Sequence, residues 1–230
     1  MATVLITGTN RGIGLEFVKQ FIDRGDSVIA LCRNLEAAEE LQSLNVEHQN
    51  LSLLEIDVAA VESLQYLSAQ LGSEAVDVFI NNAGVYGPKG VQFGNVEASD
   101  WLDVFNINTV VPLLLTQQLI GNLRKGRDKK LIYLTSKMGS ITDNSSGGSY
   151  IYRSSKTALN QVVKSISLDL ADEGFTAAVL HPGWVLTDMG GPNALIDTST
   201  SVTGMISLID KLQPGQSGGF YNYDGSQIPW

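Results

Sequence analysis

Thr7-Gly8-Thr9-Asn10-Arg11-Gly12-Ile13-Gly14 is the stretch that decides the fold. It ends the short apolar run Thr3–Thr7 and opens a segment, 12–24, whose apolar residues recur with helical spacing. Glycines between a strand and a helix permit a tight turn, let the backbone approach a pyrophosphate and allow close packing of the helix on the strand. Phosphates there would meet free N–H groups at the positive end of the helix. The stretch therefore predicts an α/β fold with a dinucleotide site.

Working outward from this turn, short runs rich in β-branched residues alternate with segments of helical spacing. The predicted strands are Thr3–Thr7, Ser27–Cys32, Leu51–Ile56, Val76–Asn81, Lys130–Thr135, Thr176–His181 and Gly219–Tyr223. The predicted helices are 12–24, 35–44, 60–71, 99–122, 151–172 and 198–212. Strands that are apolar throughout and separated by helices indicate a parallel sheet covered on both faces. We expect one doubly wound, Rossmann-type α/β domain over 1–230, with a seven-stranded parallel sheet and its ligand site at the carboxyl ends of the strands.

Composition excludes several classes of partner. The net charge of -9 argues against binding to nucleic acid and to anionic membranes. No uninterrupted apolar run reaches the roughly 18 residues of a membrane span, and no basic leader precedes the first strand. The lone Cys32 cannot form an internal disulfide and is interpreted as a small buried hydrophobe, with a reactive thiol as the alternative. Two histidines, one cysteine and scattered acids do not make a metal site, so we expect a cytoplasmic protein without a metal.

The glycine spacing TGxxxGxG resembles that of the short-chain dehydrogenase/reductase family. Other motifs of this family follow in order along the chain: Asp57-Val58, Asn81-Asn82-Ala83-Gly84, Asn108, Ser136, Tyr152-Arg153-Ser154-Ser155-Lys156 and Pro182-Gly183-Trp184-Val185-Leu186-Thr187. Within the family, Tyr150–Asn160, His181–Gly191 and Gly218–Trp230 are similar to the sniffer/C-factor group of carbonyl reductases. The likeness covers nearly the whole chain.

The resemblance implies a set of site residues. The catalytic set would be Asn108, Ser136, Tyr152 and Lys156. The cofactor would contact Gly8, Asn10, Arg11, Gly12, Ile13, Gly14, Arg33, Asp57, Val58, Asn82, Ala83, Gly84, Tyr152, Lys156, Pro182, Gly183, Val185 and Thr187. The resemblance also implies a small carbonyl substrate (a ketone, aldehyde, diketone or quinone) and a homodimer that pairs helices 99–122 and 151–172. An isologous contact would suit these two long apolar helices.

The chemistry of carbonyl reduction gives Tyr152 its expected role independently. The reaction needs a hydride at carbon and a proton at oxygen, and a free tyrosine, with a pKa of about 10, releases its proton poorly near neutral pH. A nearby cation lowers that pKa, and Lys156, four residues on, shares a helical face with Tyr152. We therefore expect Tyr152 to be the general acid and Ser136 to polarise the substrate oxygen. The segment between Ser136 and Tyr152 is longer than in most family members. The glycine-rich loop 143–149 accounts for the excess and is expected to border the substrate.

The residues after the second predicted strand indicate which nicotinamide cofactor is used. NAD enzymes place an acid there for the ribose 2′-hydroxyl, whereas this chain reads Leu31-Cys32-Arg33-Asn34. Arg33, together with Arg11 in the glycine turn, offers forked donors to a 2′-phosphate. NADP(H) is therefore the predicted cofactor. The alternative is that Arg33 is simply solvated.

Other features are left open by the sequence. His181, at a strand end, is interpreted as a packed or hydrogen-bonded histidine, with a catalytic imidazole as the alternative. Pro112 cannot donate to the carbonyl of Asn108, so we expect a distorted helix whose Asn108 carbonyl is free and points toward Lys156. The family resemblance implies that Asn108 holds a water linked to that lysine. The alternative is a kink that only improves packing. The alternative to a reductase is a C-factor-like regulatory protein that binds the cofactor and turns over only incidentally. Tyr86, Met189 and similar residues are candidates for the walls of the substrate site, and the sequence does not select the substrate.

Overall fold

The structure is a computed structural model that describes residues 1–230. Its centre is a seven-stranded sheet in the order β3-β2-β1-β4-β5-β6-β7, and every neighbouring pair runs parallel. The strands are β1 Thr3–Thr7, β2 Ser27–Cys32, β3 Leu51–Glu55, β4 Val78–Asn81, β5 Lys130–Leu134, β6 Thr176–His181 and β7 Gly219–Asn222. The prediction of a doubly wound sheet is confirmed, and each strand lies within two residues of its predicted bounds.

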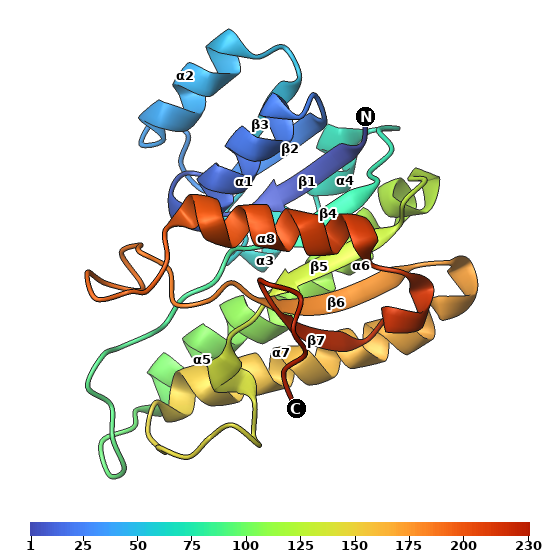
Figure 1. Ribbon diagram of the computed structural model, residues 1–230. Coiled ribbons are helices and arrows are strands. Elements are labelled where there is room, and N and C mark those ends of the chain that lie inside the picture. Colours follow the sequence, from blue (N-terminus) through green and yellow to red (C-terminus); the bar gives the residue numbers. More distant parts are fainter.

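Helices cover both faces of this sheet (Figure 1). They are α1 Gly12–Asp23, α2 Glu39–Glu47, α3 Val61–Leu64, α4 Leu67–Leu71, α5 Ala98–Phe105, α6 Val111–Lys125, α7 Tyr150–Asp169 and α8 Thr198–Lys211. Alternate side chains of β1 separate into two apolar clusters because successive residues of a strand point to opposite faces. Val4 and Ile6 pack with α1, α2 and α8, whereas Leu5 packs with α3, α4, α6 and α7.

Two predicted helices are wrong in detail. The helix predicted at 35–44 begins only at Glu39, because the Asn34 side chain accepts a hydrogen bond from the Ala37 N–H and turns the chain first. The helix predicted at 60–71 is broken into α3 and α4. Near the break, the Ser63 hydroxyl donates to the carbonyls of Asp57 and Ala60. Side chains of this kind compete with helical hydrogen bonds.

The predicted helix 99–122 runs from Ala98 to Lys125 and changes its winding in the middle. Asn106–Val110 form a π-helical turn in which the Val111 N–H donates to the Asn106 carbonyl, five residues back, and Pro112 opens the next α-helical turn. The expected distortion at Pro112 is therefore present. By length and composition Ala98–Lys125 is also long and apolar enough to cross a membrane, which was not predicted from the sequence. Its buried leucines Leu115, Leu119 and Leu123 pack into the core beside the sheet, as in the core helix of a globular fold.

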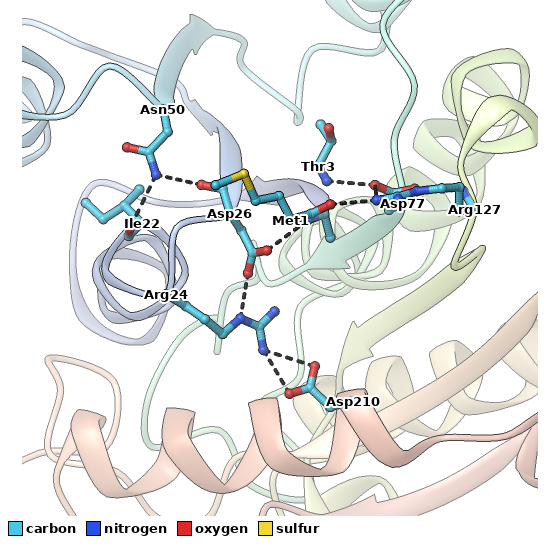
Figure 2. Close-up of polar contacts among 10 residues, drawn as sticks. Met1, Thr3, Ile22, Arg24, Asp26, Asn50, Asp77, Arg127 and Asp210 are labelled. Atoms are coloured by element: carbon cyan, nitrogen blue, oxygen red, sulfur yellow. Dashed lines mark hydrogen bonds and ion pairs between the residues drawn. The ribbon is translucent and has the colours of Figure 1, made fainter.

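The two edges of the sheet differ in what the chain places there. Beyond the carboxyl ends of the strands lie the longest connections, 82–97, 135–149 and 182–197, which project on the left in Figure 1. At the amino edge the connections are tied by a network of charged and backbone groups (Figure 2). Asp77 accepts from the N–H groups of Thr3 and Arg127, at 2.8 and 2.7 Å, and Asp26 accepts from the Ala2 N–H at 2.8 Å. This contrast leaves the carboxyl edge open for a site.

Candidate active site

The glycine turn is fastened to the two strands on either side of β1. The Gly8 N–H donates to the Leu31 carbonyl at 2.8 Å, and the Asn82 amide donates to the carbonyls of Thr7 and Gly8 at 2.9 and 3.0 Å. Gly8 has a φ of +70°, a backbone conformation that favours glycine. A Cβ on Gly14 would lie 2.1 Å from the Gly8 carbonyl oxygen, so only glycine lets α1 approach β1 this closely.

The start of α1 offers backbone donors to a ligand. No side chain caps the helix, and its first three residues, Gly12, Ile13 and Gly14, line a cleft of about 590 Å³. Uncapped N–H groups and the helix dipole favour an anion at such a position. The turn therefore fits the pyrophosphate of a dinucleotide, because it supplies both the close backbone approach and the donor set.

Most of the predicted cofactor residues meet in this one cleft. It is lined by Gly8, Asn10, Arg11, Gly12, Ile13, Gly14, Arg33, Asp57, Val58, Asn82, Ala83, Gly84, Tyr152, Lys156, Pro182 and Thr187. Gly183 and Val185 do not line it. Val185 is buried and pairs with Ile196, and a Cβ on Gly183 would lie 2.7 Å from the Ile196 side chain, so packing of the 182–197 segment accounts for both residues.

Tyr152 and Lys156 lie on α7, one helical turn apart, and face the cleft. Both are buried, with 8% and 4% of their surface exposed, and the Lys156 ammonium lies 5.9 Å from the centre of the Tyr152 ring. The Lys156 ammonium donates to the Leu134 carbonyl at 3.0 Å. Ser136, which follows β5, accepts from the Met138 N–H at 3.1 Å, and its hydroxyl lies close enough to the Tyr152 phenol to affect the pKa of that group. The structure thus brings together the three groups that the sequence motifs pointed to.

The pKa values of this pair are set by burial. Burial raises the pKa of Tyr152 to about 12; the hydrogen bond with Ser136 opposes the rise and the neighbouring Tyr86 adds to it. Burial lowers the pKa of Lys156 to about 8. The expected lowering of the pKa of Tyr152 by Lys156 is therefore wrong for this structure, because loss of solvent around the phenol outweighs any effect of the cation.

Asn108 acts through its side chain. Its amide nitrogen donates to the Val85 carbonyl at 2.8 Å and to the Ser155 hydroxyl at 3.0 Å, and its amide oxygen accepts from the Val85 N–H at 2.9 Å. A Cβ on Gly84 would lie 3.1 Å from the same oxygen and 3.3 Å from the Lys156 ammonium nitrogen, so these groups are close together. The free, water-holding Asn108 carbonyl expected from Pro112 stays a prediction.

Sequence reasoning missed the side chains that hold the site together. Ser155, fully buried, links Asn108 to α7, and the Asn160 amide oxygen accepts from the Thr135 hydroxyl at 2.7 Å beside the Ser136 turn. Both residues stand in the quoted segment Tyr150–Asn160, but a single sequence gives no sign that a serine or an asparagine on a helix points inward. The residues missed are thus supports of the site.

The two arginines proposed for a 2′-phosphate both line the cleft. Arg11 is largely exposed and forms an ion pair with Asp188 at 2.6 Å, whereas Arg33 follows β2 at the opposite end of the glycine turn. An ion pair this exposed contributes little to stability, so Arg11 is available to another anion. Arg33 has no carboxylate within ion-pair distance.

His181 lies at the end of β6 and outside the cleft lining. Burial lowers its pKa to about 4, with Lys137 adding to the lowering and Asp143 opposing it. Its Nδ1 is buried without a hydrogen-bond partner, so His181 is a packed histidine, one of the two forms expected from the sequence. A catalytic imidazole is not supported by this position.

Comparison with known proteins agrees with this geometry. The short chain dehydrogenase family matches residues 2–195. The C-signal protein of Myxococcus xanthus is 48% identical over 155 residues, which are 67% of this chain and 93% of that protein. The carbonyl reductase Sniffer of D. melanogaster is 38% identical with a TM-score of 0.94, and both chains are fully covered. The NADPH-bound carbonyl reductase from chicken fatty liver is 32% identical with a TM-score of 0.93, covering 100% of this chain and 99% of that one. This chain belongs to the short-chain dehydrogenase family, close to its Sniffer and C-factor members.

Proposed function

We propose that the protein is an NADPH-dependent reductase of small carbonyl compounds and that Tyr152 is its general acid. One observation carries the proposal: the buried Tyr152, with Ser136 beside its phenol, lines the same cleft as the uncapped start of α1. A proton donor and a dinucleotide site thereby share one space, which the reduction of a carbonyl requires.

The roles of the side chains follow from their positions. A phenol whose pKa is raised to about 12 carries its proton at neutral pH, and Tyr152 would give that proton to the more basic oxygen that forms as a carbonyl accepts a hydride. The oxidative direction would need the phenolate, which this pKa disfavours. Ser136 polarises the carbonyl oxygen, and Lys156 places a positive charge beside the reaction. Asn108 supports the segment that follows β4 through its hydrogen bonds to Val85.

NADP(H) would lie along the carboxyl edge of the sheet. When bound it supplies the hydride, while the glycine turn and the first N–H groups of α1 hold its pyrophosphate. Arg11 and Arg33 would hold the 2′-phosphate, because guanidinium groups present paired donors to phosphate oxygens. Asp57 and Val58, which also line the cleft, would border the adenine. The NADPH named for the chicken fatty liver reductase supports the choice of cofactor.

The regulatory alternative rests on the similarity to the C-signal protein. The arrangement of Ser136, Tyr152 and Lys156 favours catalysis, because a protein that only senses the cofactor needs the nucleotide turn alone.

A cytoplasmic location and a homodimer through Ala98–Lys125 and α7 are further parts of the proposal. Trp101, Leu102, Val110 and Leu168, on those helices, have exposed apolar side chains, and light scattering at micromolar concentration tests the dimer.

The experiment that tests the function follows NADPH consumption by its absorbance in the presence of a panel of small dicarbonyls, quinones and aldehydes. We expect turnover with at least one class of carbonyl and a clear preference for NADPH over NADH. NADPH that binds but is not consumed with any of these carbonyls would favour the regulatory alternative. The same assay ranks the substrate classes.

A further inference from the structure

Tyr86 makes a contact with Tyr152 that the proposed chemistry leaves unexplained. Tyr86 follows β4, and its ring lies 4.6 Å from the ring of Tyr152, tilted by 30°. Its hydroxyl is hydrogen-bonded to the Ser149 hydroxyl at 3.0 Å. Tyr86 therefore bridges the proposed acid and the loop that enters α7. Aromatic rings in offset or tilted contact at this separation attract each other beyond simple burial.

Ser149 holds an unusual backbone conformation at this point. It has a φ of +47°, in the left-handed region that residues with a Cβ seldom adopt, and it follows two glycines that also have positive φ, Gly147 and Gly148. Ser149 immediately precedes α7, whose third residue is Tyr152. The conformation of this one residue thus sets the direction in which the helix carrying Tyr152 begins.

The rest of the 143–149 loop is fastened to α7. The guanidinium of Arg153 donates to the Ser146 hydroxyl at 2.9 Å and to the Met138 carbonyl at 3.3 Å. The Gly147 N–H donates to the Asn144 side chain at 3.0 Å. The loop is therefore held from α7 by Arg153, and at its other end the Tyr86–Ser149 hydrogen bond ties it to the segment after β4.

We propose that Tyr86 is a positioning residue for Tyr152. Its ring holds the Tyr152 phenol beside the Ser136 hydroxyl and keeps water from one face of it, and the hydrogen bond with the Ser149 hydroxyl, the latch, fixes the Tyr86 ring in that place. Ser136, Lys156 and Tyr86 are the polar and titratable groups that surround the phenol. The inference rests on the proposed role of Tyr152 and adds a residue that no motif of the family marks.

Three substitutions separate the ring from the latch. Tyr86→Phe and Ser149→Gly each remove the same hydrogen bond and keep the ring, and glycine suits the positive φ at position 149, so this variant is expected to fold well. Tyr86→Leu removes the ring as well. Tyr66→Leu is the matched control, because Tyr66 is an exposed tyrosine outside the cleft lining.

The first readout does not depend on turnover. Ionisation of the Tyr152 phenol is followed by ultraviolet absorbance as pH rises, as the difference between each protein and its own Tyr152→Phe counterpart. In the Tyr86→Leu background we expect the Tyr152 midpoint to fall by about one unit toward the free value, because water reaches the phenol. The Tyr66→Leu control keeps the wild-type midpoint. An unchanged midpoint in Tyr86→Leu overturns the proposal, even for a protein that shows no reductase activity.

The second readout is kinetic and uses the carbonyl that the wild type reduces best. We expect kcat to fall about tenfold in Tyr86→Leu and about threefold in Tyr86→Phe and in Ser149→Gly, with the affinity for NADPH unchanged. The double variant Tyr86→Phe/Ser149→Gly should lose no more than either single variant, because all three lack the same bond. Losses that multiply in the double variant, or a Tyr86→Leu enzyme with wild-type kcat, contradict the latch. A wild type without turnover would instead overturn the proposed function and leave the titration as the test.

Discussion

Both edges of the sheet contain buried titratable groups, and the pKa values of these groups shift for opposite reasons at the two edges. At the amino edge, burial alone would raise the pKa of Asp77, but hydrogen bonds from the Thr3 and Arg127 N–H groups and the charge of Arg127 outweigh it, so its pKa is lowered. At the carboxyl edge, burial prevails: the pKa of Tyr152 rises and that of Lys156 falls. Hydrogen-bond and ion-pair partners therefore decide the direction of each pKa shift. The carboxyl edge, whose titratable groups have fewer such partners, is the edge suited to catalysis.

At the amino edge the charged side chains have several hydrogen-bond and ion-pair partners (Figure 2). Asp26 accepts from Arg24 at 2.5 Å, and the same guanidinium reaches Asp210 on α8 at 2.8 Å. The Asn50 amide adds a bond of 2.7 Å to the Asp26 carbonyl and one of 3.2 Å to the Ile22 carbonyl. Contacts of this kind join segments that are far apart in sequence, and they stabilise the fold without offering a group for reaction.

Apart from the loss of Tyr152 itself, the largest expected effect comes from removing the cation of the carboxyl edge. Lys156→Ala should lower kcat by about a hundredfold or more, the range for loss of a group engaged in proton transfer, and weaken NADPH binding as well. Steady-state kinetics and NADPH fluorescence titration measure the two effects. Lys164→Ala, on the same helix but outside the cleft lining, is the control and should behave as wild type. A Lys156→Ala enzyme with near wild-type kcat would show that the charge of Lys156 is not needed for catalysis.

The second prediction concerns the 2′-phosphate. Arg33→Asp should shift the cofactor preference toward NADH, because one charge-assisted pair with the phosphate is lost; the loss in NADPH selectivity should be about 1.5–3 kcal/mol. The ratio of kcat/KM for the two cofactors measures it. Lys125→Asp, at the far end of α6, makes the same change of charge away from the cleft and should leave the ratio unchanged. Equal kcat/KM for NADPH and NADH in the wild type would refute the assignment.

The third prediction uses pH. An ammonium is charged below its pKa, and burial lowers the pKa of Lys156 to about 8. Activity that needs this charge should therefore be full at neutral pH and decline as pH rises through about 8, well below the value near 10.4 of a free lysine. The pH dependence of kcat/KM measures the midpoint. In Lys156→Arg, whose side chain stays charged, the decline should disappear from whatever activity remains.

The smallest effect on activity is expected at the amino edge. Asp77→Asn should cost about 1.5–3 kcal/mol of stability, since charged hydrogen bonds to two N–H groups are weakened, with kcat per folded molecule unchanged. For a chain of this size each kcal/mol lowers Tm by roughly 2–4 °C. Asp210→Asn, in a more exposed pair, should lower Tm far less.

Asp77 also makes the stability of the folded protein fall at acid pH. Because the folded-state pKa of Asp77 is lowered, its contribution is complete above the unfolded value of about 3.9 and is lost as pH falls through the folded-state value. The Asp77→Asn variant should therefore lose less Tm than the wild type when pH falls through that window. A loss of kcat in Asp77→Asn, with the protein fully folded, would contradict the claim that the amino edge serves stability and not catalysis.

The features that the sequence predicts well are those with local signals. Strands, helices, the glycine turn and the Tyr152–Lys156 pair each depend on spacing within a few residues, so they could be placed from the chain alone. The network of Asp26 and Asp77 could not, because its partners come from segments far apart in sequence. The pKa of Tyr152 was predicted in the wrong direction because the charge of Lys156 can be read from the sequence, four residues on, whereas the burial of the phenol cannot. The Tyr86–Tyr152 contact likewise depends on how two loops meet in space.

The central claim is that Tyr152 supplies the proton at the carboxyl edge. Its most direct test compares wild type and Tyr152→Phe for the NADPH-dependent reduction of the best dicarbonyl, with NADPH affinity and Tm measured on the same samples. The account predicts that kcat falls to an undetectable level while the affinity for NADPH and the Tm stay close to wild type, because only the acid is removed. Loss of general-acid catalysis lowers a rate by about 10²–10⁴-fold, so a Tyr152→Phe enzyme that keeps more than about a tenth of the wild-type kcat would contradict the claim.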